Sequence, residues 1–171
     1  MTPSNFIKEF SPRCFYHFTD TRNLNSIKVH GLLSLVELQN QEIEIPCCGG
    51  NDWSHEADAR HGLDGFVHLC LFDQHPMEYI VRVKEERIKK SSFLKISTDV
   101  LNLDGVLFTA GVANKAGMRT LSLKEAVAEM DFEVVYTRTN WKDPEIQRRM
   151  RVAQKYELLI PTHVPLKYIT I

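Results

Sequence analysis

The sequence has no long hydrophobic run, few cysteines and almost no excess of charge of either sign. No stretch of its 171 residues approaches the roughly 18 consecutive apolar residues that predict a membrane-spanning helix. With 21 basic and 22 acidic side chains, the formal net charge is −1. This balance excludes the strongly basic class of nucleic-acid-binding proteins, with pI above about 9, but leaves open a local basic patch.

Cysteine is too scarce and too unevenly spaced to form a disulfide framework. The four cysteines are Cys14, Cys47, Cys48 and Cys70, and two of them are adjacent. Disulfide-stabilised domains usually have more cysteines in a shorter chain. The first residues also lack the basic and then apolar pattern of a signal peptide. We therefore expect a reduced, cytoplasmic protein that does not associate with a membrane.

The composition predicts one soluble globular domain over residues 1–171. Hydrophobic residues make up 43% of the chain and charged residues 25%, which is typical of globular proteins rather than disordered ones. We expect strands at 13–18, 65–72, 92–97, 105–109, 132–136, 156–161 and 167–171. We expect helices at 24–29, 52–61, 123–130 and 144–151, and either a helix or a strand at 76–81. Because the strands are scattered among the helices, the pattern favours an α+β fold.

Charge is segregated along the chain rather than mixed. Residues 37–66 contain seven acids and one base, Arg60, and are expected to form a loop around the short helix at 52–61. Residues 82–95 and 138–155 each contain six bases and two acids, which gives each segment a local charge of +4. Either basic segment is a candidate track for nucleic acid, although basic helices are more often simply solvated.

Metal binding and cysteine catalysis are not favoured by the spacing of the residues. Six potential ligands lie within 24 residues: Cys47, Cys48, His55, His61, His68 and Cys70. Their spacing matches none of the common zinc-binding motifs, so we predict no metal site. Cys70 lies in an apolar strand, where a buried and unreactive thiol is expected.

Three other residues have both a structural and a functional interpretation. His17 ends an apolar strand beside a helix N-terminus and is either a hydrogen-bonded structural residue or a ligand contact. Arg60 either pairs with Glu56 one helical turn away or grips a phosphate. Glu157 lies between Tyr156 and Leu158 in a strand, and is either exposed or placed in a cleft to stabilise a developing positive charge.

Several segments, taken in order, resemble the DarT family of NAD-dependent nucleic-acid ADP-ribosyltransferases, which are the toxins of toxin–antitoxin pairs. The matching segments are Tyr16-His-Phe-Thr19, Asn23-Leu-x-x-Ile27, Gly31-x-Leu33, His55-x-x-x-x-Arg60, Phe66-Val-His-Leu69, Pro76-Met-x-Tyr79, Leu107-Phe-Thr-x-x-x-x-Asn114, Trp141-x-Asp-Pro-Glu145, Arg148-Arg149 and Glu157-Leu-Leu159. The resemblance covers essentially residues 12–171.

The resemblance implies an ADP-ribosyltransferase-like split β core with flanking helices and an NAD cleft. It assigns cofactor binding to His17, Phe18, Thr19, Ser26, Leu33 and Arg60, and catalysis to Arg60 and Glu157. NAD is expected as co-substrate without a metal, single-stranded nucleic acid as acceptor, and a macrodomain antitoxin as partner. The chemistry fits, because cleavage of the nicotinamide–ribose bond produces an oxocarbenium-like centre that a carboxylate stabilises.

Two departures from the family pattern leave alternatives open. Residues 73–75 read Asp-Gln-His where the family often has Pro-Arg-Ser, and residues 155–156 read Lys-Tyr where it often has Gln-Ala. One alternative is a non-catalytic module of the same fold that binds NAD or nucleic acid. The other is an NAD-independent hydrolase or phosphotransferase that uses His17 or His68.

Overall fold

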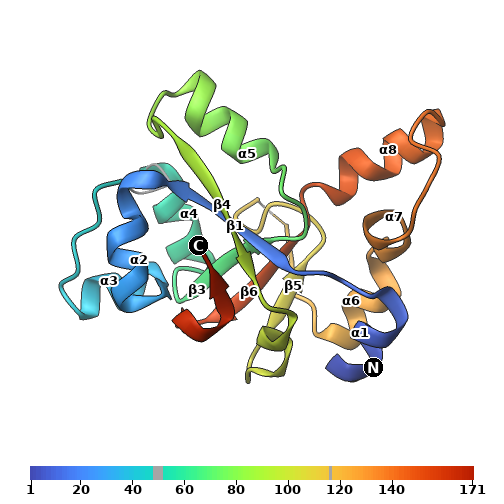
Figure 1. Cartoon of the computed structure of the whole chain (residues 1–171), viewed down its shortest axis with the longest axis horizontal. Helices are drawn as coiled ribbons and strands as arrows, with labels where there is room; N and C mark the ends of the chain where they lie inside the picture. The colour runs from blue at the N-terminus through green and yellow to red at the C-terminus, as the bar shows by residue number, and fades with distance from the viewer. Residues whose placement is uncertain (48–51, 116) are drawn as a thin grey trace.

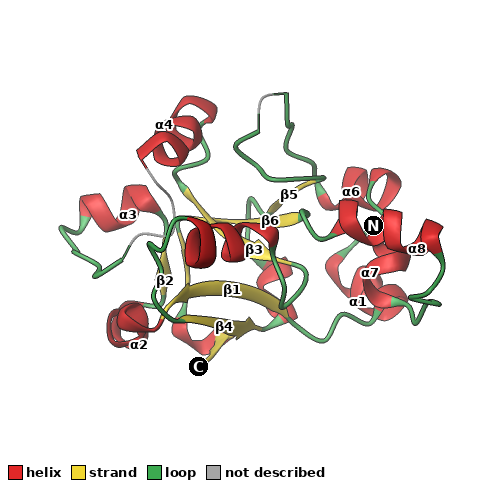
Figure 2. Ribbon diagram, turned by 90° about the horizontal axis from the view of Figure 1, so that it is seen from above, coloured by secondary structure: helices red, strands yellow, loops and turns green. Residues whose placement is uncertain are grey.

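The core of the molecule is a six-stranded antiparallel sheet (Figures 1 and 2). The computed structural model describes residues 1–47, 52–115 and 117–171. The strands of the sheet are β1 (Phe15–Asp20), β3 (Phe66–Cys70), β4 (Ser91–Ile96), β5 (Leu107–Thr109), β6 (Glu157–Pro161) and β8 (Ile169–Thr170). Their order is β5-β6-β3-β1-β4-β8, and a separate pair joins β2 (Leu32–Leu33) to β7 (His163–Val164). The expected α+β architecture is confirmed.

Helices gather at the two ends of this sheet (Figure 1). One group is α2 (Leu24–His30), α3 (Leu35–Asn40) and α4 (Asp52–His61). The opposite group is α1 (Pro3–Phe10), α6 (Leu123–Glu129), α7 (Phe132–Tyr136) and α8 (Pro144–Ala153). Between them, α5 (Pro76–Tyr79) continues into a π-helical turn at Ile80–Lys84. Short 3-10 turns occupy Thr21–Asn23, Thr98–Asn102 and Leu166–Tyr168. None of the helices described is long and apolar enough to cross a membrane.

The central position of β6 explains its continuous apolar sequence. β6 lies between β3 and β5, and Glu157 faces Cys70 on one neighbour and Thr109 on the other. Leu158, Leu159 and Ile160 are all fully buried. A strand covered on both faces needs apolar residues at consecutive positions, so the glutamate that begins β6 is an exception in this strand.

The strand predicted at residues 132–136 is wrong, because this segment forms the helix α7. Asp131 caps it by accepting a hydrogen bond from the backbone N–H of Val134 at 3.2 Å. The helical spacing stacks the rings of Phe132 and Tyr136 with centroids 6.1 Å apart, and Phe6 meets Phe132 edge-on at 4.9 Å. Packing of both aromatic rings against α1 favours the helix over the β propensity of the segment.

Two further differences from the sequence predictions concern short elements. Residues 35–40 form α3, which extends into the segment 37–66 expected to be a loop, and Ser34 caps this helix by accepting from the N–H of Glu37 at 3.2 Å. The chain end was expected to be a strand over 167–171, but only Ile169–Thr170 pair with β4. The ambiguous segment at 76–81 is helical.

Candidate active site

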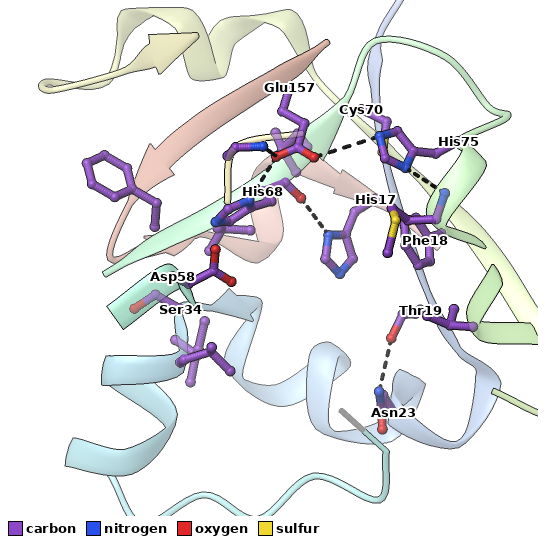
Figure 3. Close-up of a pocket in the computed structure, with 18 of the residues that line it drawn as sticks. His17, Phe18, Thr19, Asn23, Ser34, Asp58, His68, Cys70, His75 and Glu157 are labelled. Atoms are coloured by element: carbon purple, nitrogen blue, oxygen red, sulfur yellow. Dashed lines mark hydrogen bonds and ion pairs between the residues drawn. The ribbon is translucent and has the colours of Figure 1, made fainter. Parts of the chain in front are cut away.

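A cavity of about 250 Å³ opens where β1, β3 and β6 meet the helices α3 and α5 (Figure 3). Its lining combines apolar side chains with ten polar or charged ones, and ligand sites usually combine both kinds. The residues that line it include His17, Phe18, Thr19, Asn23, Leu33, Ser34, Asp58, His68, Cys70, His75, Ala113 and Glu157. The cavity lies close to the lower limit of the usual range of about 300–1,000 Å³ for sites that hold a drug-sized ligand.

Glu157 is buried at one end of this cavity, with only 6% of its surface exposed. Its Oε2 accepts a hydrogen bond from His68 Nδ1 at 2.9 Å and a longer one from the backbone N–H of Ala113 at 3.4 Å. Its Oε1 lies 3.8 Å from His75 Nε2. Since burying a carboxylate without donors is costly, these groups explain how the strand accommodates it. The alternative that Glu157 is simply exposed is excluded.

His68 on β3 is held between two acceptors. Its Nδ1 donates to Glu157, and its Nε2 lies 3.4 Å from the carbonyl oxygen of Leu63. Burial disfavours the charged ring, but the hydrogen bond to Glu157 and the negative charges of Glu157 and Asp58 outweigh it and raise the pKa of His68. A protonated His68 therefore satisfies both acceptors and places a positive charge beside the carboxylate.

His75 approaches the other oxygen of Glu157 from the start of α5. Its Nδ1 accepts a hydrogen bond from the backbone N–H of Met77 at 3.3 Å, so the ring proton is on Nε2. This Nε2 is buried, makes no hydrogen bond with any residue that the structure describes, and faces Glu157 at 3.8 Å. Burial lowers the pKa of His75 more than the charge of Glu157 raises it, and the ring stays neutral. His75 thus presents a neutral N–H toward the carboxylate.

His17 and Phe18 bring β1 to the same end of the cavity. His17 Nδ1 donates to the carbonyl oxygen of His68 at 3.0 Å, which leaves Nε2 as an acceptor. Burial lowers the pKa of His17 more than this hydrogen bond raises it, so the ring is neutral. The ring of Phe18 stacks on His75 with centroids 5.9 Å apart and an interplanar angle of 22°. His17 is both a hydrogen-bonded residue of the fold and a residue that lines the cavity, so the two interpretations do not exclude each other.

The end of β1 is tied to the loop that follows α3. Asn23 Nδ2 donates to Thr19 Oγ1 at 3.0 Å and to the carbonyl oxygen of Cys47 at 2.6 Å. In return, Asn23 Oδ1 accepts from the N–H of Cys47 at 3.1 Å. The buried amide therefore holds Thr19 and the backbone of Cys47 in a fixed relation along one wall of the cavity.

A sequence model of the DarT family, described as ssDNA thymidine ADP-ribosyltransferase, matches residues 16–171 of this chain. The chain belongs to the DarT family. No curated relative matches it. The structure is similar to Thermus sp. 2.9 DarT in complex with ADP-ribosylated ssDNA, with a TM-score of 0.69 and 22% identity over 93% of this chain and 79% of that one.

Two further solved structures share the fold. For Thermus sp. 2.9 DarT in complex with NAD+, the TM-score is 0.58 and the identity 20% over 92% of this chain and 79% of that one. For Thermosipho africanus DarTG in complex with ADP-ribose, the TM-score is 0.68 and the identity 20% over 92% of this chain. This chain spans only 43% of the Thermosipho chain.

Five of the DarT-like site residues line one cavity, and two do not. The cavity brings together His17, Phe18, Thr19, Leu33 and Glu157. The remaining two are Ser26, half-buried on α2, and Arg60, exposed on α4, and neither is among the residues that line it.

Helix geometry explains the position of Arg60. Asp58 lines the cavity, and residues two apart on a helix point to nearly opposite sides. Arg60 Nε donates to the backbone carbonyl oxygen of Glu56 at 3.1 Å. This contact involves the backbone of Glu56 and not the carboxylate, so it is not the ion pair considered from the sequence.

Several cavity residues were not among the site residues predicted from the sequence. Ser34 begins a Ser-x-x-Glu pattern typical of helix N-termini, and His75 directly precedes the proline that begins α5, so both carried a recognisable capping signal. Asn23 belongs to a DarT-like segment, but its contact with Cys47, 24 residues away, arises only through the fold.

The structure places no metal-binding group among the residues it describes. No three side chains of His, Cys, Asp or Glu gather there to hold an ion. Cys48 lies outside the described residues. Cys70 is buried, and burial together with the charge of Glu157 raises the pKa of its thiol well above the ordinary value. A thiol in this state is a poor nucleophile, in agreement with the expectation for Cys70.

Proposed function

We propose that this chain is an NAD-dependent mono-ADP-ribosyltransferase that modifies thymidine bases in single-stranded DNA. The family to which the chain belongs supports the acceptor, and the complexes of the Thermus relative with NAD+ and with ADP-ribosylated ssDNA support both substrates. The observation that carries the proposal is Glu157, a carboxylate buried at the end of a cavity beside His17 and Phe18.

In this proposal the cavity holds the nicotinamide–ribose end of NAD. Its volume of about 250 Å³ suits one end of a dinucleotide better than the whole of it. The neutral His17 offers an acceptor at Nε2, Phe18 offers a ring face, and Thr19 and Leu33 complete the wall. Ser26 and Arg60 are assigned to NAD through the family resemblance, and Arg60 meets the pyrophosphate because guanidinium binds phosphate in a bidentate manner.

The chemical step is a substitution at the ribose carbon. The bond from this carbon to the nicotinamide nitrogen breaks, and its electron pair leaves with nicotinamide. A nitrogen of the acceptor base forms the new bond and loses its proton, so the products are the ADP-ribosylated base, nicotinamide and H⁺. The carboxylate of Glu157 stabilises the positive charge that develops on the ribose, as in glycoside cleavage.

His68 and His75 position that carboxylate. The raised pKa of His68 keeps a donor on Oε2, while the neutral Nε2–H of His75 faces Oε1. The hydrogen bond to Oε2 and the N–H that faces Oε1 favour one orientation of the carboxylate before substrate arrives, which reduces the reorganisation needed in the transition state.

Incubation with labelled NAD tests the proposal. The wild-type chain should transfer label to single-stranded DNA and release nicotinamide, with no transfer to RNA or protein offered separately. Binding of NAD without nicotinamide release would indicate the non-catalytic module instead. Activity that needs no NAD would indicate the hydrolase or phosphotransferase that uses His17 or His68.

We also propose that the chain is one DarT-like domain over residues 1–171 that acts in the cytoplasm as a toxin. The free thiols of Cys14 and Cys70 support a reducing compartment, and the likeness to Thermosipho DarTG supports a macrodomain antitoxin. Expression should arrest growth, a Glu157→Gln variant should not, and co-expressed macrodomain protein should restore growth. Cell fractionation tests the location, and growth arrest that persists in the Glu157→Gln variant would contradict the toxin assignment.

A further inference from the structure

A second hollow of about 300 Å³ lies along α8, next to an exposed tryptophan. Trp141 leaves 72% of its surface exposed, in the segment between α7 and α8 (Figure 1). The helix contributes one stripe of side chains at a spacing of three or four residues, which includes Ile146, Met150 and Gln154. One wall of the hollow therefore runs along α8 and includes the apolar side chains of Ile146 and Met150, and Trp141 also lines the hollow.

The backbone around Trp141 is held in place. Gln147 Nε2 on α8 donates to the carbonyl oxygen of Trp141 at 3.1 Å. The N–H of Lys142 donates to Asn140 Oδ1 at 3.2 Å, and Lys142 Nζ lies over the indole, 5.5 Å from its centroid. The indole is thus presented to solvent from an ordered segment with a cation beside it.

Around the hollow, several Arg and Lys side chains form no ion pair with a carboxylate of the described residues. Arg149 binds Asp131 and Glu133, and these ion pairs fix it to α7. Arg148 binds Glu145. Four exposed cations make no ion pair with any residue that the structure describes: Arg138, Lys142, Arg151 and Lys155. Of these, Arg151 lines the hollow itself. An aromatic ring beside unpaired cations is complementary to a nucleobase and its phosphates.

The hollow lies near the active site, as shared wall residues show. Gln154 also lines a neighbouring hollow of about 230 Å³ together with Tyr79 of α5. That hollow in turn shares His75 with the cavity of Glu157. The three hollows are therefore adjacent, and each shares one wall residue with the next.

We propose that Trp141 and the stripe on α8 form a stacking subsite for a nucleobase a few nucleotides away from the modified one. From residue 146 to residue 154 the helix rises about 12 Å, and stacked bases are about 3.4 Å apart, so the subsite serves a base a few nucleotides from the acceptor. This inference rests on the proposed function, because it requires single-stranded DNA as the substrate.

The test measures binding of a dye-labelled oligothymidylate without NAD, so that no transfer takes place. Trp141→Ala should weaken binding about tenfold, whereas Trp141→Phe, which retains a ring, should bind close to the wild type. The matched control is Val152→Ala, since Val152 is 48% exposed on the same helix but outside the hollow, and it should have no effect. Indole emission should be quenched by the oligonucleotide in the wild type, and Trp141→Phe should remove this change.

Salt dependence separates stacking from charge. Trp141→Ala should leave the slope of log affinity against log salt unchanged, while Arg151→Gln should reduce its size by about 0.7. Equal binding by Trp141→Ala and the wild type, equal losses for the Ala and Phe variants, or no indole quenching would overturn the subsite. Modification of DNA by the wild type would then still support the proposed function. Conversely, binding that depends on Trp141 without any transfer of ADP-ribose would support the subsite and contradict the transferase proposal.

Discussion

The Glu157 end of the cavity and the helix that carries Arg60 differ in how their charged side chains are fixed. Glu157 is buried in a central strand, with donors from His68 and Ala113 on one oxygen and His75 facing the other. Arg60 is exposed, and its hydrogen bond is to a carbonyl of its own helix. The carboxylate is therefore preorganised by the fold, whereas the guanidinium keeps the freedom to change rotamer when an anion binds.

The largest expected effect is that of Glu157→Gln at the preorganised end. Removing an electrostatic contact to the transition state typically lowers the rate about 10²- to 10³-fold. Nicotinamide release should fall by this factor, while NAD titration and the melting temperature stay close to those of the wild type. Glu145→Gln, at an exposed carboxylate on α8, is the control and should be fully active. A Glu157→Gln variant that transfers ADP-ribose at the parent rate would disprove the assigned role.

Arg60→Ala should have a smaller effect, confined to substrate handling. We expect both NAD affinity and activity to fall by roughly tenfold or more, because a charge-assisted contact to phosphate is lost. Stability should be unchanged, since the side chain is exposed. Isothermal titration with NAD and chemical unfolding measure the two properties separately. An unchanged NAD titration would remove Arg60 from the site.

Substitutions of His75 can separate its role as an N–H donor that faces Glu157 from its role as the N-cap of α5. His75→Asn retains an N-cap for α5 but loses the N–H that faces Glu157, whereas His75→Gln retains a long donor with a weaker cap. We expect kcat to fall about tenfold in the Asn variant, with KM for NAD unchanged, and to recover partly in the Gln variant. If both variants lose kcat in proportion to their loss of stability, His75 is only structural.

The smallest expected effect is on the pH dependence of stability. The pKa of His68 is higher in the folded state than its ordinary value of 6.5. Its contribution is therefore fully present below the unfolded pKa and is lost as the pH rises through the folded pKa. The difference in unfolding free energy between the wild type and His68→Gln should be greatest below about pH 6.5 and should shrink at alkaline pH. Urea unfolding across this range measures it, and a difference that grows with pH would contradict the assignment.

The sequence predicted the parts of the fold that depend on local patterns. The helix predicted around 24–29 ends at Gly31, as expected. This glycine has a positive φ of 73°, and any side chain added there would collide with a backbone carbonyl oxygen. The cap and proline at Asp143-Pro144 begin α8 as expected. The strand predicted at 132–136 failed because Val134 and Val135 favour β structure locally, whereas the packing of Phe132 and Tyr136 favours a helix.

The candidate site likewise has residues that the sequence predicted and a contact that only the fold creates. The ordered DarT-like segments of the sequence point to His17, Phe18, Thr19, Leu33 and Glu157, and the cavity contains all five. In the sequence, His75 stands out as part of a departure from the family pattern and as the residue before the proline that begins α5. Its relation to Glu157, which lies 82 residues further along the chain, arises only when β6 pairs with β3 and α5 follows β3.

The sequence by itself determined the family, the α+β class and the residue types that the chemistry needs, because these follow from motifs and local hydrophobic patterns. It also showed that a net charge of −1 conceals two basic segments and one acidic segment. Only the tertiary structure decided that Glu157 is buried between two histidines, that Arg60 is exposed and does not line the cavity, and which cations around α8 make no ion pair with the residues that the structure describes. Burial, pairing and direction depend on contacts between distant segments, and no local pattern encodes them.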